Sequence, residues 1–253
     1  QQVAPFAWRC DGIQSQAAVR EEVAAACLTM QLDAAFVPAD LALSDFRLLV
    51  MDMDSTLITI ECIDEIADMQ GLKTEVAEIT EAAMRGELEF GESLQRRVAL
   101  LEGLDASALT RVFEERLELS LGAHAMLHAM KEAGLRTVLV SGGFTYFTER
   151  LQQELELDVT RANLLEVVDG KLTGKVIGDI VDADAKQAMV ESQSADLGVP
   201  TSAAIVIGDG ANDLRMMSVA GLSVAFRAKP VVQAQANIAL NFSGLDGVLN
   251  LFR

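Results

Sequence analysis

Val50-Met51-Asp52-Met53-Asp54-Ser55-Thr56-Leu57 is the stretch that decides the fold of this chain. It continues an apolar run, Phe46–Met51, which only Arg47 interrupts and which is typical of a strand buried in a parallel sheet. Open α/β sheets bind ligands at the carboxyl ends of their strands. Two carboxylates at such an end, Asp52 and Asp54, are held by the sheet and reached by substrate, which suits a nucleophile or a metal ligand. The alternative is a cluster of Asp, Ser and Thr that caps a helix N-terminus.

The length and composition indicate one sizeable domain with a smaller insertion or appendage. The chain has 253 residues, of which 51% are hydrophobic, so it can bury a substantial core. Its formal net charge of −18 opposes binding to nucleic acid or to an anionic membrane, and neither is expected as a partner. We find no apolar run of about 18 residues and no basic-then-apolar leader. We therefore expect a cytoplasmic protein whose three cysteines are free thiols.

Strand and helix signals alternate from about residue 46, which predicts an α/β fold with a Rossmann-like, doubly wound parallel sheet. Asp169-Gly170 predicts a type I′ turn, and hence a hairpin between strands at Leu165–Val168 and Lys171–Val176. The remaining strand candidates are Thr137–Val140 and Ala203–Ile207, followed by the weaker Leu222–Phe226 and Ile238–Leu240.

More than eighty residues separate the first two strands, far more than a crossover needs. Their pattern predicts a helical-bundle cap inserted at about 60–120, which would cover the carboxyl edge of the sheet as a lid. Residues 1–45 contain one expected helix, at about 12–32, and are interpreted as an N-terminal arm packed on a main domain of residues 46–253. The helices expected in the cap are Asp64–Met69, Lys73–Met84, Gly91–Leu101 and Ala106–Arg116.

Three further segments carry residues that suit phosphate chemistry. Ser141-Gly142-Gly143 follows the second strand, where small residues expose backbone N–H groups to an anion. Gly208-Asp209-Gly210-Ala211-Asn212-Asp213 follows the third strand, and its oxygen-bearing side chains suit Mg²⁺. Lys186, in an expected helix, could stabilise phosphate oxygens. Each signal alone has an ordinary explanation, such as a turn or a solvated charge, but their shared order favours a single site.

These residues resemble the motifs of the haloacid dehalogenase superfamily and, within it, the phosphoserine phosphatase family, over about residues 46–253. The resemblance implies a Mg²⁺-dependent phosphomonoesterase that converts O-phospho-L-serine to L-serine and phosphate through an aspartyl-phosphate, the last step of serine biosynthesis. The alternative is a related phosphatase or phosphotransferase for another small phosphate, for example with homoserine as acceptor. The expected partner is the small phosphate substrate, and the chain is expected as a monomer or homodimer. The matching residues outside the segments named above are Glu61, Met84, Phe90, Arg97, Phe144, Lys171 and Asp179-Ile180-Val181.

The resemblance also implies roles for the polar residues. Asp52 is the expected nucleophile, and Asp54 the general acid and base. Mg²⁺ is expected on Asp52, the backbone carbonyl of Asp54 and Asp209, with Asp213 supporting the metal and Lys186. The residues expected around the phosphate are Ser141, Gly142 and Lys186, with Asn212 near the substrate.

Residues of the expected cap carry the substrate assignment. Glu61 can pair with the ammonium group of phosphoserine, and Arg97 can bind its carboxylate in a bidentate manner. Phe90 is the expected apolar shutter that excludes water. The ordinary explanations are an acid at a helix start for Glu61 and a solvated surface charge for Arg97. Arg85 departs from the family pattern, in which a small residue often follows Met84.

Overall fold

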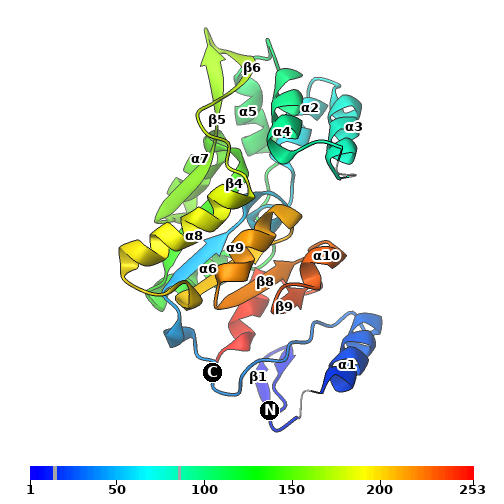
Figure 1. The fold of residues 1–253 in the computed structure, drawn as a ribbon, viewed down its shortest axis with the longest axis vertical. Helices are drawn as coiled ribbons and strands as arrows, with labels where there is room; N and C mark the ends of the chain where they lie inside the picture. The colour runs from blue at the N-terminus through cyan, green and yellow to red at the C-terminus, as the bar shows by residue number, and fades with distance from the viewer. Residues whose placement is uncertain (14–15, 85–86) are drawn as a thin grey trace.

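A seven-stranded sheet forms the centre of the computed structural model, which describes residues 1–13, 16–84 and 87–253. Its strands are β3 (Leu48–Met51), β4 (Arg136–Phe144), β5 (Val159–Val168), β6 (Lys171–Ile177), β7 (Ala204–Gly208), β8 (Leu222–Phe226) and β9 (Ile238–Leu240). Their order is β6-β5-β4-β3-β7-β8-β9, and only β5 and β6 pair antiparallel. The chain runs outward from β3 to β6 and returns to β7 on the other side of β3 (Figure 1). The end of β3 is therefore the switch point, where such sheets bind ligands.

Helices cover both faces of this sheet, which confirms the predicted doubly wound fold (Figure 1). Alternate residues of β3 serve the two faces, because successive side chains of a strand point in opposite directions. Leu49 joins the core beneath α6 and α7, whereas Val50 joins the core beneath α8 and α9. The helices of the body are α6 (Ala123–Glu132), α7 (Thr145–Leu155), α8 (Ala183–Leu197), α9 (Leu214–Val219) and α10 (Pro230–Gln233).

The prediction that the second strand ends at Val140 is wrong, because β4 continues through the small residues to Phe144. Its pairing with β5 is irregular there. Val140 pairs with Arg161 and Phe144 with Asn163, so β4 advances from 140 to 144 while β5 advances only from 161 to 163. Extra residues on one strand bulge out of the ladder and redirect the chain. The bulge places Ser141-Gly142-Gly143 at the carboxyl edge of the sheet.

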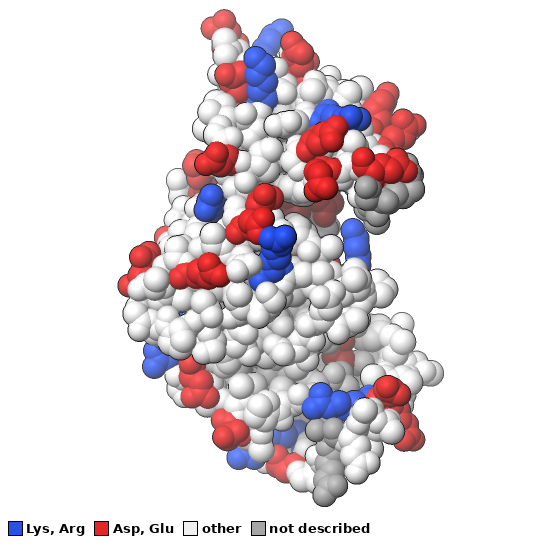
Figure 2. Space-filling model, in the orientation of Figure 1, with Lys and Arg blue, Asp and Glu red and all other residues white. Residues whose placement is uncertain are grey.

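The segment between β3 and β4 forms a helical insertion at the carboxyl edge of the sheet (Figure 1). We use the name helical insertion for α2 (Cys62–Asp68), α3 (Lys73–Met84), α4 (Phe90–Ala99) and α5 (Ser107–Glu115). Acidic side chains are spread over both the helical insertion and the body (Figure 2), in keeping with 38 Asp and Glu residues against 20 Lys and Arg.

The hairpin of β5 and β6 reaches up to the helical insertion. Asp169 and Gly170 have φ values of 49° and 77°, as a type I′ turn requires, which confirms the predicted hairpin. The loop between α4 and α5 binds this turn through the main chain. Gly103 N–H donates to Leu172 O, Ala106 N–H to Gly170 O and Leu172 N–H to Leu104 O, each at 2.8 Å.

The N-terminal region lies beside the C-terminal end of the chain (Figure 1). It contains the short strands β1 (Gln2–Ala4) and β2 (Ala7–Trp8) and the helix α1 (Ala17–Thr29), which is shorter than predicted. Residues 14–15 of the predicted helix lie outside the described residues. Helix α1 buries none of its residues, but Val37, Leu41 and Leu43 after it pack against the core. Polar contacts also attach this region: Arg9 donates to the Leu251 carbonyl at 3.0 Å, and Asp33 accepts from Ser243 N–H at 2.8 Å. The division of the chain into arm, main domain and cap stays a prediction.

No helix in the described part of the chain is long and apolar enough to cross a bilayer. The cysteines are free, as predicted: Cys10 is exposed, Cys27 is half-buried and Cys62 is buried.

Candidate active site

Lys186 is fully buried between two carboxylates at the carboxyl edge of the sheet. Its Nζ lies 2.8 Å from Oδ2 of Asp52 and 2.7 Å from Oδ1 of Asp213. It stands near the start of α8, where Asp182 caps the helix by accepting the N–H of Ala185 at 2.9 Å. Burial lowers the pKa of Lys186, but Asp213 and Asp52 outweigh burial and raise it above its ordinary value. The ammonium group therefore stays charged, and Lys186 is not the solvated helix charge of the alternative explanation.

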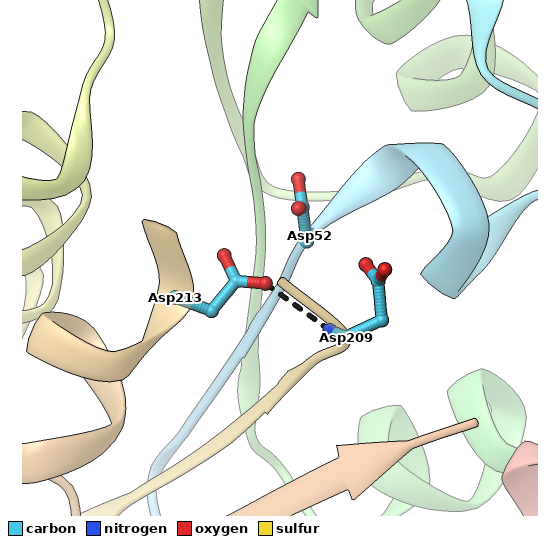
Figure 3. Close-up of side chains that lie close together, drawn as sticks. All are labelled: Asp52, Asp209 and Asp213. Atoms are coloured by element: carbon cyan, nitrogen blue, oxygen red, sulfur yellow. Dashed lines mark hydrogen bonds between the residues drawn. The ribbon is translucent and has the colours of Figure 1, made fainter. Parts of the chain in front are cut away.

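Three aspartates from two segments converge (Figure 3), and two of them are the carboxylates that contact Lys186. Asp52 follows β3, Asp209 follows β7, and Asp213 ends the short turn after it. Each offers a carboxylate oxygen within 4.8 Å of the others, and within the described ranges they are the only such group of acidic, His or Cys side chains. Asp213 is fixed by accepting the N–H groups of Asp209 at 3.1 Å and Gly210 at 3.0 Å. Converging carboxylate oxygens are the donor set that Mg²⁺ and other hard divalent cations prefer.

The charges of this cluster favour a bound cation. Burial raises the pKa of Asp52 well above its usual range, and the Asp213 carboxylate raises it further, while Lys186 opposes both effects. Burial and then Asp213 raise the pKa of Asp209 to about 6. Three carboxylates face one buried ammonium group. A divalent cation would offset this excess negative charge and favour the ionised carboxylates.

Asp54 connects β3, β4 and the helical insertion. Its Oδ1 accepts the N–H of Cys62 at 3.1 Å, at the start of α2. A Cβ atom at Gly143 would lie 2.7 Å from Oδ2 of Asp54 and 3.0 Å from Oγ of Ser141, so only glycine allows this approach. Burial, and then the Glu61 carboxylate, raise the pKa of Asp54 to about 7. The capping explanation is therefore correct in part, yet the same carboxyl group can exchange a proton near neutral pH.

The ring of Phe90 lies against the bulge of β4. Phe90 is the first residue of α4, and a Cβ atom at Gly142 would lie only 2.7 Å from its Cζ. Ser141 is buried in the same bulge, where its Oγ accepts the N–H of Gly143 at 2.8 Å. The structure thus brings the predicted shutter residue and the predicted phosphate-binding residues into contact.

Glu61, the residue before α2, and Arg97 of α4 lie close enough for the charge of each to act on the pKa of the other. Glu61 is exposed and accepts a hydrogen bond from Ser55 Oγ at 2.6 Å. Desolvation by the surrounding protein raises the pKa of its carboxyl group, and the Asp64 carboxylate raises it further. Burial lowers the pKa of Arg97, while the carboxylates of Asp64, Glu61 and Asp54 oppose this effect. The two side chains thus offer a negative and a positive group on the side of the site that the insertion covers.

Asn212 lies in the same turn as Asp209 and Asp213, with Oδ1 folded back on the chain. A Cβ atom at Gly210 would lie 2.1 Å from that oxygen. Arg85, the departure from the family pattern, lies outside the described residues, as does the side chain of Met84.

Three residues that contact or face this site had no role predicted from the sequence. Thr56 is buried, and its hydroxyl donates to Oδ1 of Asp209 at 3.1 Å. Lys229 follows β8, and its positive charge lowers the pKa of Glu61. Asn163 binds the carbonyl of Gly142 at 2.8 Å. Thr56 and Lys229 could have been found because they follow strands that end at the same edge of the sheet, whereas Asn163 carries no such signal.

Comparisons with known proteins agree with this arrangement. The family model of haloacid dehalogenase-like hydrolases matches residues 49–218. The phosphoserine phosphatase of Polaromonas sp. (strain JS666 / ATCC BAA-500) is 53% identical over 219 residues, which cover 85% of this chain and 93% of that protein. The unliganded crystal structure of the probable phosphoserine phosphatase from Vibrio cholerae is 41% identical, with a TM-score of 0.81, and the match covers 91% of this chain and 71% of the other.

A second solved structure is a phospho-aspartyl intermediate analogue of phosphoserine phosphatase. It is 37% identical, with a TM-score of 0.77, and the match covers 82% of this chain and 99% of the other. Fold, site and relatives agree: this chain belongs to the phosphoserine phosphatase family of the haloacid dehalogenase-like hydrolases.

Proposed function

We propose that this enzyme is a Mg²⁺-dependent phosphomonoesterase that hydrolyses O-phospho-L-serine to L-serine and phosphate. The observation that carries the proposal is the buried contact of Lys186 with Asp52 and Asp213, at the switch point of the sheet. Three parts that phosphoryl transfer through an aspartate requires are present: the Asp52 carboxylate, whose ionised form a bound cation would favour, the buried ammonium group of Lys186, and the carboxyl group of Asp54, with a pKa of about 7.

The proposed reaction has two steps. A carboxylate oxygen of Asp52 forms a bond to phosphorus as the bond from phosphorus to the serine oxygen breaks, and Asp54 gives its proton to that oxygen. Ionised Asp54 then removes a proton from water, whose oxygen attacks phosphorus and releases phosphate from Asp52. Lys186, Ser141 and the N–H groups of the β4 bulge would hold the phosphate oxygens.

The donor atoms at the site fit Mg²⁺. Asp52, Asp209 and the backbone carbonyl of Asp54 would hold the ion, and Asp213 would support it. The bound ion would supply positive charge next to the phosphate oxygens.

The helical insertion would act as a cap that binds the ammonium and carboxylate groups of the substrate. Glu61 would pair with the ammonium group and Arg97 with the carboxylate, because the two side chains carry opposite charges and both lie within electrostatic reach of each other beside Asp54. Phe90, pressed against Gly142, would exclude water from the phosphate site. In this interpretation residues 46–253 form the catalytic unit and residues 1–45 an arm.

The experiment that tests this function is phosphate release from phosphoserine, phosphothreonine and p-nitrophenyl phosphate, each with Mg²⁺ and with excess chelator. We expect phosphoserine to be the preferred substrate and the chelator to abolish turnover, because the carboxylate cluster alone would repel the phosphate dianion. Turnover of the aryl phosphate alone would retain the mechanism and refute the substrate. Turnover unaffected by the chelator would refute the metal.

Arg97→Ala should lower kcat/KM for phosphoserine by about 10- to 100-fold, because a charge-assisted pair with the carboxylate contributes about 1.5–3 kcal/mol. An aryl phosphate has no carboxylate, so its kcat/KM should change little. Arg96→Ala is the matched control, since Arg96 is exposed and pairs with Glu92 on the same helix at 2.6 Å. Equal losses on both substrates would contradict the role of Arg97.

The cytoplasmic location and the monomeric or homodimeric state remain predictions. Fractionation and light scattering of the full chain would measure them.

A further inference from the structure

Asn163 is a buried amide beside the bulge of β4. Asn163 is only 1% exposed, and its backbone pairs with that of Phe144, where the β4–β5 ladder resumes. A carbonyl group inside a bulge loses its partner on the neighbouring strand, and a buried carbonyl without a partner is costly. Asn163 Nδ2 supplies that partner, donating to the carbonyl of Gly142 at 2.8 Å.

The other half of the same amide binds a different segment. Asn163 Oδ1 accepts the N–H of Val181 at 2.8 Å. Val181 directly precedes Asp182, which caps α8 and whose carbonyl accepts the N–H of Lys186 at 3.0 Å. A carbonyl can only accept and an N–H can only donate, so the two partners fix the orientation of the amide. No charged side chain offers one donor and one acceptor in this arrangement.

We propose that Asn163 is a positioning residue that holds the bulge with Ser141 and Gly142 at a fixed distance from Lys186. The inference deepens the proposed function, because these two segments would hold the phosphate group from different sides. The amide of Asn163, on β5, links the two segments through one donated and one accepted hydrogen bond. Displacements of about 1 Å in groups that position a substrate can lower turnover roughly 100-fold. Among the residues proposed to bind the substrate, Asn163 forms a side-chain hydrogen bond only with Gly142, which would bind the phosphate group. Its loss should therefore weaken phosphate binding and leave recognition of the serine moiety unchanged.

The test compares Asn163→Ala, which removes both hydrogen bonds, with Asn163→Asp, which keeps the acceptor for Val181 and removes the donor for Gly142. We expect kcat/KM to fall at least about tenfold for phosphoserine and for p-nitrophenyl phosphate alike. The inhibition constant of orthophosphate should rise in parallel. Agreement between the two variants would show that the negative charge of Asp is not the cause.

Asn237→Ala is the matched control. Asn237 Oδ1 accepts from the N–H and the hydroxyl of Ser223 at 2.8 and 2.9 Å, linking β8 to the residue before β9. Its loss should lower the melting temperature without changing kcat/KM or the orthophosphate inhibition constant. Circular dichroism and thermal melts of every variant would establish that the kinetics are measured on folded protein.

The proposal is overturned if a folded Asn163 variant keeps wild-type kcat/KM and orthophosphate affinity. A loss of activity confined to phosphoserine would also overturn it, because Asn163 would then act in recognition of the serine moiety. If neither variant folds, the proposal is overturned because Asn163 is then required for folding. Failure of the proposed function has a different signature. If the wild type does not hydrolyse phosphoserine, orthophosphate binding measured by calorimetry still compares Asn163→Ala with the wild type.

Discussion

Asp52→Asn should abolish phosphate release while leaving the folded protein at least as stable as the wild type. Loss of a nucleophile typically costs 10⁴-fold or more in turnover, so we expect a loss of at least about 10⁴-fold. Stability should not fall, because burial and the Asp213 carboxylate already disfavour the ionised form of Asp52 in the folded state. An amide removes that repulsion, and Lys186 keeps Asp213 as a partner at 2.7 Å.

The measurement is single-turnover phosphate release together with urea unfolding. Asp169→Asn is the control. It removes a carboxylate at the turn of the hairpin, outside the cluster of Asp52, Asp209 and Asp213, and should leave turnover unchanged. Mass spectrometry must show that the amide has not deamidated to Asp. Turnover close to wild type in intact Asp52→Asn would remove Asp52 from the role of nucleophile.

Lys186→Met should lower activity and stability together, in contrast to Asp52→Asn. Without the ammonium group, the buried carboxylates of Asp52 and Asp213 would lose the ion pairs that they form with Lys186. Breaking a buried ion pair by removing one partner typically costs about 3–5 kcal/mol of unfolding free energy. Turnover should fall by about 10²–10³-fold or more, because a fixed charge next to the phosphate oxygens is lost.

Urea unfolding and kcat would be compared with those of Lys175→Met, which removes an exposed lysine on β6 and should change neither. The double variant Lys186→Met with Asp52→Asn should regain part of the lost stability, because one of the two stranded carboxylates is then neutral. If the double variant is no more stable than Lys186→Met alone, repulsion between stranded carboxylates is not the cause.

The central strands β3, β7 and β8 could be predicted from the sequence because they are buried on both faces and therefore consist almost entirely of apolar residues. Leu222–Phe226 and Ile238–Leu240 form strands with the predicted bounds. The polar residues at the strand ends could be placed for the same reason, since parallel strands bring their carboxyl ends to one edge. Asp52 and Asp209 accordingly lie together although 157 positions separate them in the sequence.

The parts that could not be predicted depend on partners distant in the sequence. The end of β4 is set by its pairing with β5, and nothing in Ser141-Gly142-Gly143 itself distinguishes a bulge from a turn. Asn163 looks like any polar residue of a strand until Gly142 and Val181 are placed beside it. The helix α1 was predicted from its apolar residues, but those residues are not buried.

The contact between the loop after α4 and the hairpin turn has a consequence for how this family can diversify. Its three hydrogen bonds join backbone groups only, so they specify spacing and not side-chain identity. Point substitutions at Leu104 or Ala106 that keep the backbone path would leave these hydrogen bonds in place, whereas a side chain at Gly103, whose φ is 81°, would strain the loop. A one-residue insertion in the loop would shift every pair out of register. A helical insertion transferred from a relative should therefore pack correctly only when the β5–β6 hairpin of that relative is transferred with it. We expect the helical insertion and the hairpin to change together as one unit during evolution.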